Sequence, residues 1–126
     1  MRIAILAPLV EPVPPPLYGG TERVVSLLTE ELVRRGHDVT LFASGDSQTA
    51  ATLVPVCPSG LRLDPEVKDY AAYTLVALSE AYSGTRDFDL FHNHNDYLAF
   101  GMARLASTPT VTTTHGRLDL QEVRRI

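Results

Sequence analysis

Leu17-Tyr18-Gly19-Gly20-Thr21-Glu22-Arg23-Val24-Val25 is the stretch that decides the fold, because it joins a glycine pair to the start of an amphipathic helix. The two glycines allow a tight turn and let another molecule approach the backbone closely. Free N–H groups and the positive end of the helix dipole favour a phosphate at this point. The sequence therefore predicts a nucleotide or sugar-phosphate site at Gly19, Gly20 and Thr21. Tyr18 either covers that site or is an ordinary loop aromatic.

Hydrophobic patterning around this stretch alternates strands with helices. Residues 2–7 form an apolar run typical of a buried central strand, and residues 8–16 form a proline-rich loop expected to be exposed. Residues 21–35 place their apolar side chains at helical spacing and end before Gly36. The order of the elements predicts a Rossmann-like, doubly wound, mostly parallel α/β sheet with helices on both faces. Further strands are expected over residues 38–43, 51–56, 88–92 and 109–114, and further helices over 66–82, 97–105 and from 118 onward.

Composition limits the class of protein. The chain has 126 residues, of which 44% are hydrophobic and 21% charged, which predicts a single domain over residues 1–126. A net charge of −4, with no run of more than two Lys or Arg, argues against a nucleic-acid partner. Cys57 stands alone, which fits a reducing cytoplasm, and no apolar stretch has the length of a membrane span. We expect a cytoplasmic protein, and peripheral membrane contact stays open.

Polar residues follow the carboxyl ends of the predicted strands, where ligands of doubly wound sheets bind. The second strand is followed by Ser44-Gly45-Asp46, the fourth by His94-Asn95-Asp96 and the last by His115-Gly116. We expect these segments to converge with the glycine pair on one cleft. A histidine followed by glycine can project into that cleft while the backbone turns sharply.

The segment His92-Asn93-His94-Asn95-Asp96 allows a metal-centred interpretation. H-x-H-x-D resembles the metal motif of metallo-β-lactamase-type hydrolases, and two imidazoles one residue apart on a strand point the same way. Against it, Tyr97 stands where that family has a further histidine, and only His37 and His115 remain as other imidazoles. We therefore expect no metal ligand, with His92 a satisfied histidine within its strand.

Taken together, these motifs resemble the N-terminal domain of GT-B fold, family 4 glycosyltransferases. The resemblance begins with a first strand ending in Ala-Pro, the proline-rich loop and residues 18–25, followed by Arg35-Gly36-His37-Asp38-Val39-Thr40-Leu41-Phe42. Phe88-Asp89-Leu90-Phe91-His92-Asn93-His94 and Pro109-Thr110-Val111-Thr112-Thr113-Thr114-His115-Gly116 complete it. These segments cover nearly the whole chain in the family's order and spacing.

The resemblance implies retaining transfer of a sugar from a nucleotide-diphosphate sugar to an acceptor, with no cofactor and no obligatory metal. It makes His115 the residue beside the transferred sugar. The donor base, the donor sugar and the acceptor are not identified by it. It places Gly19, Gly20, Thr21 and Gly116 at the donor phosphate and sugar, and Tyr18, His94, Asn95 and Asp96 at the acceptor side and the pocket lining.

The family's C-terminal, donor-binding domain is missing from the chain. We therefore expect a truncated N-terminal, acceptor-side half that is inactive until that domain is supplied in cis or in trans. A sheet cut short would also leave an open edge or an apolar face, which favours a homo-oligomer. Two other interpretations stay open: a non-catalytic Rossmann-like module that binds a nucleotide or a partner protein, and the metal-dependent hydrolase.

Overall fold

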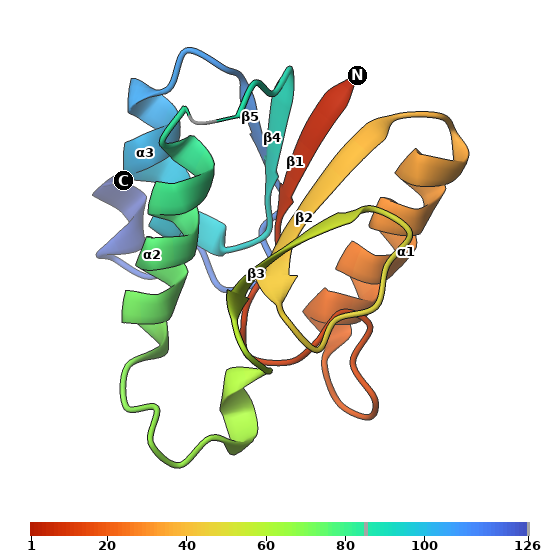
Figure 1. Ribbon diagram of the computed structural model, residues 1–126. Helices are drawn as coiled ribbons and strands as arrows, with labels where there is room; N and C mark the ends of the chain where they lie inside the picture. The colour runs from red at the N-terminus through yellow and green to blue at the C-terminus, as the bar shows by residue number, and fades with distance from the viewer. Residues whose placement is uncertain (85, 126) are drawn as a thin grey trace.

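The computed structural model describes residues 1–84 and 86–125, and its centre is one parallel five-stranded sheet in the order β3-β2-β1-β4-β5 (Figure 1). Every neighbouring pair of strands is parallel. This order confirms the predicted doubly wound topology, with β1 in the middle and the direction of winding reversing between β1 and β4. The strands are β1 Arg2–Leu6, β2 Asp38–Ser44, β3 Thr52–Cys57, β4 Leu90–Asn93 and β5 Thr110–Thr112.

Helices cover both faces of the sheet, as the sequence predicts (Figure 1). Helix α1 lies on one face, and α2 and α3 lie on the other. Within the described ranges, no helix has both the length and the apolar character needed to cross a membrane. The α-helices are α1 Gly20–Arg34, α2 Tyr70–Tyr82 and α3 Phe100–Leu105, and the short 3-10 helices are η1 Leu61–Leu63, η2 Asp96–Ala99 and η3 Val123–Arg125.

Strand β1 supplies side chains to both layers of the core. Ile3 and Ile5 are buried with Val25 of α1, whereas Ala4 and Leu6 are buried with Leu78 of α2 on the opposite face. Successive side chains of a strand point to opposite faces, so a strand buried on both sides needs a continuous apolar run. The first strand is apolar from Ile3 to Leu6 because helices pack against both of its faces.

Three helix predictions need correction. The helix predicted from Glu66 begins at Tyr70, because Asp69 acts as its N-cap and accepts a hydrogen bond from the backbone N–H of Ala72 at 3.1 Å. The helix predicted over residues 97–105 is a 3-10 turn followed by the short α3. The helix predicted from Leu118 is wrong apart from the turn η3, since Leu118 and Leu120 remain 43% exposed and no packing supports a helix.

The proline-rich loop is less exposed than predicted. Leu9 and Val13 are 1% and 0% exposed, and Val13 packs into the core beside α1. The backbone N–H of Val13 donates to Oγ of Ser47 at 2.9 Å, which attaches the loop to the segment that follows β2. The loop is therefore held close to the carboxyl ends of β1 and β2.

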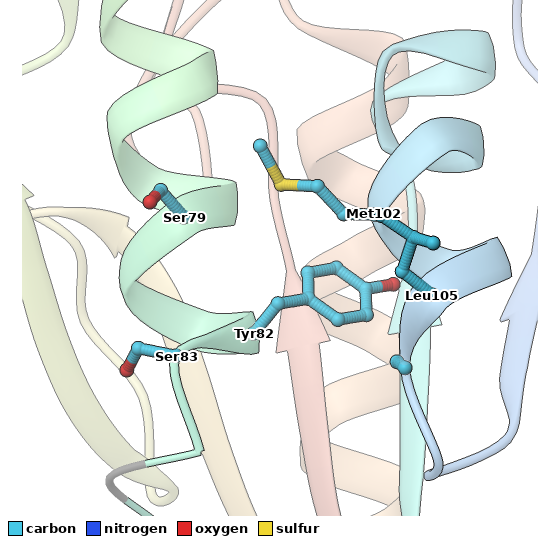
Figure 2. Close-up of a pocket in the computed structure, with 6 residues that line it drawn as sticks. Ser79, Tyr82, Ser83, Met102 and Leu105 are labelled. Carbon is cyan, nitrogen blue, oxygen red and sulfur yellow. The ribbon is translucent and has the colours of Figure 1, made fainter.

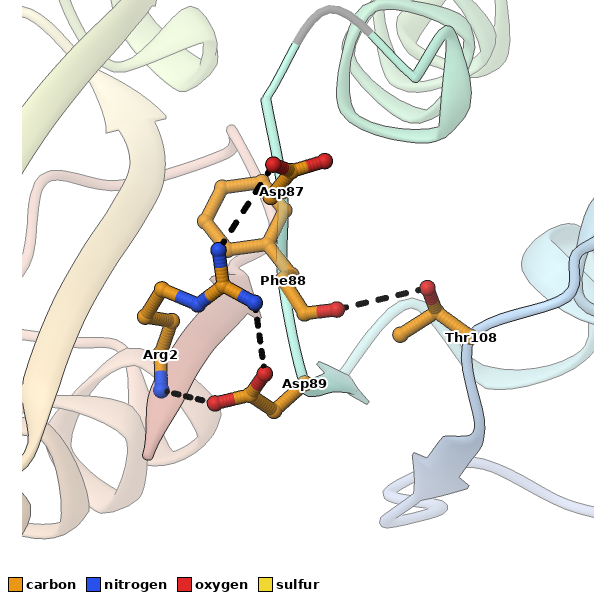
Figure 3. Close-up of polar contacts among 5 residues, drawn as sticks. All are labelled: Arg2, Asp87, Phe88, Asp89 and Thr108. Atoms are coloured by element: carbon orange, nitrogen blue, oxygen red, sulfur yellow. Dashed lines mark hydrogen bonds and ion pairs between the residues drawn. The ribbon is translucent and has the colours of Figure 1, made fainter.

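Polar contacts join β1, β4 and the segment before β5 at the amino ends of the strands (Figure 3). The backbone N–H and the guanidinium of Arg2 each donate to the carboxylate of Asp89 at 2.8 Å, and the guanidinium lies 3.7 Å from Asp87. Thr108 Oγ1 donates to the carbonyl of Phe88 at 3.3 Å. These contacts hold the strands in register at the end of the sheet opposite to their carboxyl ends.

Truncation of Leu78 tests the layer between α2 and the sheet. Leu78 is 0% exposed within the cluster that contains Ala4, Leu6 and Phe91. We expect Leu78→Ala to lower the free energy of unfolding by about 2–5 kcal/mol in urea titrations, because it leaves a cavity. The control Val76→Ala, on the same helix but 61% exposed, is expected to change it by less than about 0.5 kcal/mol. Equal losses in the two variants would contradict this packing.

Candidate functional site

A pocket of about 270 Å³ lies at the carboxyl ends of the strands. Thr21 in the first turn of α1 and His115 after β5 both line it, although they are far apart in the sequence. The predicted convergence of the helix start and this histidine on one crevice is therefore present in the structure. The lining residues are Pro8, Val10, Thr21, Tyr70, Ala71, Thr74, His94, Asn95, Asp96, Leu98 and His115.

The two glycines before α1 have different surroundings. Gly19 has a φ of 138° and is buried, and a Cβ placed on it would lie 2.8 Å from Cβ of Pro15. Gly20 is exposed, and a Cβ placed on it would meet nothing within 4 Å. The first hydrogen bond of the helix runs from the N–H of Arg23 to the carbonyl of Gly19 at 3.1 Å. The amides of Gly20 and Thr21 therefore have no acceptor within the helix.

His94 and His115 form an imidazole pair at the pocket. Nδ1 of His94 lies 2.9 Å from Nε2 of His115, and the two rings are nearly parallel, with centroids 5.2 Å apart and an interplanar angle of 25°. His94 is 2% exposed, whereas His115 is exposed. Nε2 of His94 is buried and has no hydrogen-bond partner among the described residues. His94 is thus the inner member of the pair and His115 the outer one.

Burial keeps His94 uncharged. Desolvation of the ring, together with repulsion from His92 and His115, lowers the pKa of His94 to about 3. His92 stacks behind His94 with ring centroids 4.4 Å apart, and its pKa is also lowered, mainly by desolvation. Nε2 of His92 lies 2.8 Å from Oγ1 of Thr113, which agrees with the expectation of a satisfied strand histidine.

Asp96 fixes the backbone that carries His115. Its Oδ1 accepts hydrogen bonds from the N–H of His115 at 2.7 Å and of Gly116 at 3.2 Å. Asp96 itself has a φ of 47°, the left-handed region that is uncommon for residues other than glycine. A Cβ on Gly116 would lie 2.7 Å from Oδ2 of Asp96, so a side chain at this position would displace the carboxylate. The pair of residues that the sequence analysis placed at the cleft is therefore held there from the end of β4.

Asn93 and Asn95 position the start of η2 beneath the pocket. Nδ2 of Asn95 donates to the carbonyl of Leu6 at 3.0 Å, and the N–H of Asn95 donates to Oδ1 of Asn93 at 2.9 Å. Asn93 Nδ2 donates in turn to the carbonyl of Asp96 at 2.9 Å. Because both asparagine side chains are at least 90% buried and hydrogen-bonded, they make the turn rigid.

The predicted site residues divide into two groups. Thr21, His94, Asn95, Asp96 and His115 line the pocket, whereas Tyr18, Gly19, Gly20 and Gly116 are not among its lining residues. Tyr18 is 74% exposed and lies under the guanidinium of Arg62, 5.0 Å from the ring centroid.

The segment Ser44-Gly45-Asp46 at the end of β2 was expected to line the pocket, but it does not. Ser44 is fully buried, with its hydroxyl 3.3 Å from that of Ser47. The carboxylate of Asp46 accepts a hydrogen bond from the N–H of Gly60 at 3.1 Å. These side chains connect neighbouring loops, so this predicted part of the cleft is wrong.

The H-x-H-x-D segment does not assemble as a metal site. The carboxylate of Asp96 is occupied by backbone N–H groups, and His92 contacts a threonine hydroxyl. Over residues 1–84 and 86–125, the His, Cys, Asp and Glu side chains form no group of three that could hold one metal ion. The pattern therefore builds a hydrogen-bonded turn and an imidazole pair.

The start of α2 also lines the pocket, which the sequence did not predict. Tyr70, Ala71 and Thr74 line the pocket from the first turns of this helix. A signal was present, because Asp69 is a typical N-cap and helices in a doubly wound sheet begin near the carboxyl ends of the strands. Because the helix was predicted to start four residues earlier, at Glu66, Asp69 was placed inside the helix and not at its N-cap.

A second cavity of about 310 Å³ lies between α2 and α3 (Figure 2). Tyr82 points from α2 towards α3 in this cavity, and its hydroxyl lies 3.0 Å from Oγ1 of Thr110. Its lining is small or apolar apart from hydroxyl groups, namely Ser79, Tyr82, Ser83, Met102, Leu105 and Ala106. The pocket at the strand ends is the better candidate because it combines a helix start with an imidazole pair.

The buried, uncharged state of His94 makes stability depend on pH. An unfolded chain protonates this imidazole near its ordinary pKa of 6.5, whereas the folded chain does so near 3. Between these values the unfolded state binds more protons, so stability falls as the pH is lowered. From pH 7 to pH 5 we expect His94 to contribute a loss of about 2 kcal/mol in the free energy of unfolding.

The measurement compares urea unfolding of the wild type and of His94→Asn at pH 7 and pH 5. Both proteins lose stability from their other groups, but only the wild type carries the contribution of His94. The stability difference between them is expected to change by about 2 kcal/mol over this range. An unchanged difference would show that this ring titrates normally in the fold.

Comparisons with known proteins agree with this arrangement. The family model described as Glycosyltransferase Family 4 matches residues 18–126. AviGT4, a glycosyltransferase involved in Avilamycin A biosynthesis, is similar with 26% identity and a TM-score of 0.55 over 91% of this chain and 32% of that chain. The glycotransferase of kitacinnamycin has a similar fold, with 24% identity and a TM-score of 0.51 over 98% of this chain and 33% of that chain. Comparison with curated proteins found no match.

The match to the family covers four of the five strands and most of the residues that line the pocket. It includes the whole of α1, β4 and β5, and with them Thr21, His94 and His115. This chain spans about a third of the length of each of the two solved glycosyltransferases. The parallel Rossmann-like sheet is shared with both structures. The chain therefore belongs to Glycosyltransferase Family 4, as the N-terminal domain of a GT-B glycosyltransferase.

Proposed function

We propose that this domain takes part in transferring a sugar from a nucleotide-diphosphate sugar to an acceptor, with retention of configuration at the transferred carbon. The observation that carries the proposal is the single pocket shared by the first turn of α1 and the His94–His115 pair. A helix start favours phosphate oxygens, and an imidazole at 2.9 Å from its partner offers its other nitrogen to a ligand. The two features together suit a sugar joined to a diphosphate.

The donor diphosphate would approach α1 at Gly20. The amides of Gly20 and Thr21 have no acceptor within the helix, and the open space at Gly20 admits a ligand to the backbone. Gly19 serves a different purpose, because its positive φ and the nearness of Pro15, which leaves no room for a Cβ, allow the turn that exposes these amides. Negative charge that develops on the departing phosphate would be stabilised at this helix end.

The transferred sugar would lie at His115, with the acceptor on the side formed by α2 and the turn after β4. Tyr70 and Thr74 offer hydroxyl groups there, and Tyr18 in the exposed loop before α1 would contribute to the acceptor side. We assign no resident metal ion to this reaction. The carboxylate that reaches the pocket, Asp96, already accepts two backbone hydrogen bonds.

We further propose that turnover requires a second, donor-binding domain, supplied in cis or in trans. The support is that the chain corresponds to about a third of the two similar glycosyltransferases. We expect the purified 126-residue chain to show no transfer or hydrolysis of UDP-, GDP- or ADP-sugars in a nucleotide-release assay. Turnover by this chain without a partner would overturn this part of the proposal.

Substitution of Gly20 tests the phosphate position. A methyl group at Gly20 meets no protein atom within 4 Å, so Gly20→Ala is expected to fold normally while crowding a ligand at the helix start. We expect the full enzyme carrying Gly20→Ala to bind its nucleotide-diphosphate sugar about tenfold more weakly, equivalent to about 1.4 kcal/mol. The measurement is calorimetric titration, preceded by a thermal unfolding curve.

Gly101→Ala is the matched control. Gly101 is also exposed, and its added Cβ likewise meets nothing within 4 Å, but it lies in α3, on the face of the sheet opposite to α1 (Figure 1). Its affinity for the nucleotide sugar is expected to equal that of the wild type. If Gly20→Ala also binds with wild-type affinity, the diphosphate does not contact this helix start. Weaker binding by Gly20→Ala without turnover by the full enzyme would instead favour a non-catalytic nucleotide-binding module.

A further inference from the structure

The inner histidine of the pair has a protonation state that the surrounding structure decides. A hydrogen bond between Nδ1 of His94 and Nε2 of His115, 2.9 Å apart, contains one proton, which belongs to one of the two rings. The other nitrogen of His94, Nε2, is buried and has no partner among the described residues. The ring that carries the shared proton therefore decides whether Nε2 of His94 holds a proton or a lone pair.

If His94 accepted the shared hydrogen bond at Nδ1, its own proton would lie on Nε2. That N–H would be an orphaned donor in a ring that is 2% exposed, and buried N–H groups without a partner are rare in folded proteins. If His94 donates from Nδ1, only a lone pair is left at Nε2. A doubly protonated His94 is opposed by burial and by the stacked ring of His92. The arrangement with Nδ1–H on His94 is the one that the environment favours.

We propose that His94 is a positioning residue that donates its Nδ1–H to Nε2 of His115 and so holds His115 in the tautomer with its proton on Nδ1. His115 then meets its ligand as a hydrogen-bond donor from Nδ1, which makes no hydrogen bond within residues 1–84 and 86–125. This assignment deepens the proposed sugar transfer and rests on it for its functional meaning. It makes the outer histidine a donor to a ligand oxygen rather than a base that removes a proton.

The backbone around His115 supports this role. Oδ1 of Asp96 accepts the backbone N–H groups of His115 and Gly116, so this carboxylate oxygen holds the main chain and not the imidazole. The ring orientation is then set by His94 through the hydrogen bond, which joins two nearly parallel rings at an interplanar angle of 25°. A fixed ring with a fixed tautomer is pre-organised for one hydrogen-bond geometry.

Long-range ¹H–¹⁵N correlation spectra of the full chain with ¹⁵N-labelled histidine test the assignment directly, because the nitrogen shifts distinguish the two neutral tautomers. At neutral pH we expect His94 and His115 both to carry their proton on Nδ1. A proton on Nε2 of His115, or a charged His115 ring at this pH, would overturn the inference. No donor or acceptor is needed, so failure here leaves sugar transfer standing, and failure of nucleotide-sugar binding leaves the tautomer result standing.

His94→Asn is the variant that separates positioning from a purely structural role. An asparagine amide can donate or accept, so His115 is expected to lose its single tautomer and to show averaged nitrogen shifts. His92→Asn, two residues away at the end of β4, is the matched control, since His92 contacts Thr113 and is not hydrogen-bonded to His115. In that control the Nδ1–H signature of His115 is expected to persist. Loss of the signature in both variants, or in neither, would contradict the role of His94.

Discussion

The hydrogen bonds between the end of β1 and the turn after β4 are the constraint on which the site depends. The carbonyl of Leu6 accepts from the backbone N–H of His94 and from Nδ2 of Asn95, both at 3.0 Å. These bonds join β1 to the end of β4, where the winding direction of the sheet changes. On either side of this point, α1 and α2 pack against opposite faces of the sheet. The space left between the helix starts is the pocket, and His94 enters it because its backbone is tied to β1.

The regular part of the fold was predictable from the sequence because its cause is local. Strands that are buried on both faces need continuous apolar runs, and a helix that is buried on one face needs apolar residues at a spacing of about 3.6. These two patterns identified the strands and α1. The residues from 118 onward have a helical pattern, but Leu118 and Leu120 find no surface to pack against. Whether such a pattern becomes a helix depends on tertiary contacts that no local window contains.

The site was predictable in position and only partly in detail. Parallel topology sends His94, His115 and the start of α1 to the same edge, and this needs only the order of the elements. In contrast, Gly19 and Gly20 are the same residue type in the sequence, and only their φ values and neighbours show that one shapes the turn and the other is open. The carboxylate of Asp96 was expected to line the pocket, yet its contacts with the backbone of His115 and Gly116 depend on a register that sequence spacing does not reveal.

The imidazole pair shows where this domain departs from the packing expected of a core. Nε2 of His94 is buried and has no hydrogen-bond partner within the described part of the chain, an arrangement that costs stability. An apolar residue of similar size would avoid that cost but could not form a hydrogen bond to His115. Asn93, Asn95 and Asp96 form a satisfied polar network directly beside it, so the turn itself has no such defect. Because the cost falls on the one ring that contacts the exposed histidine, we attribute it to the function of the pocket and not to the architecture of the sheet.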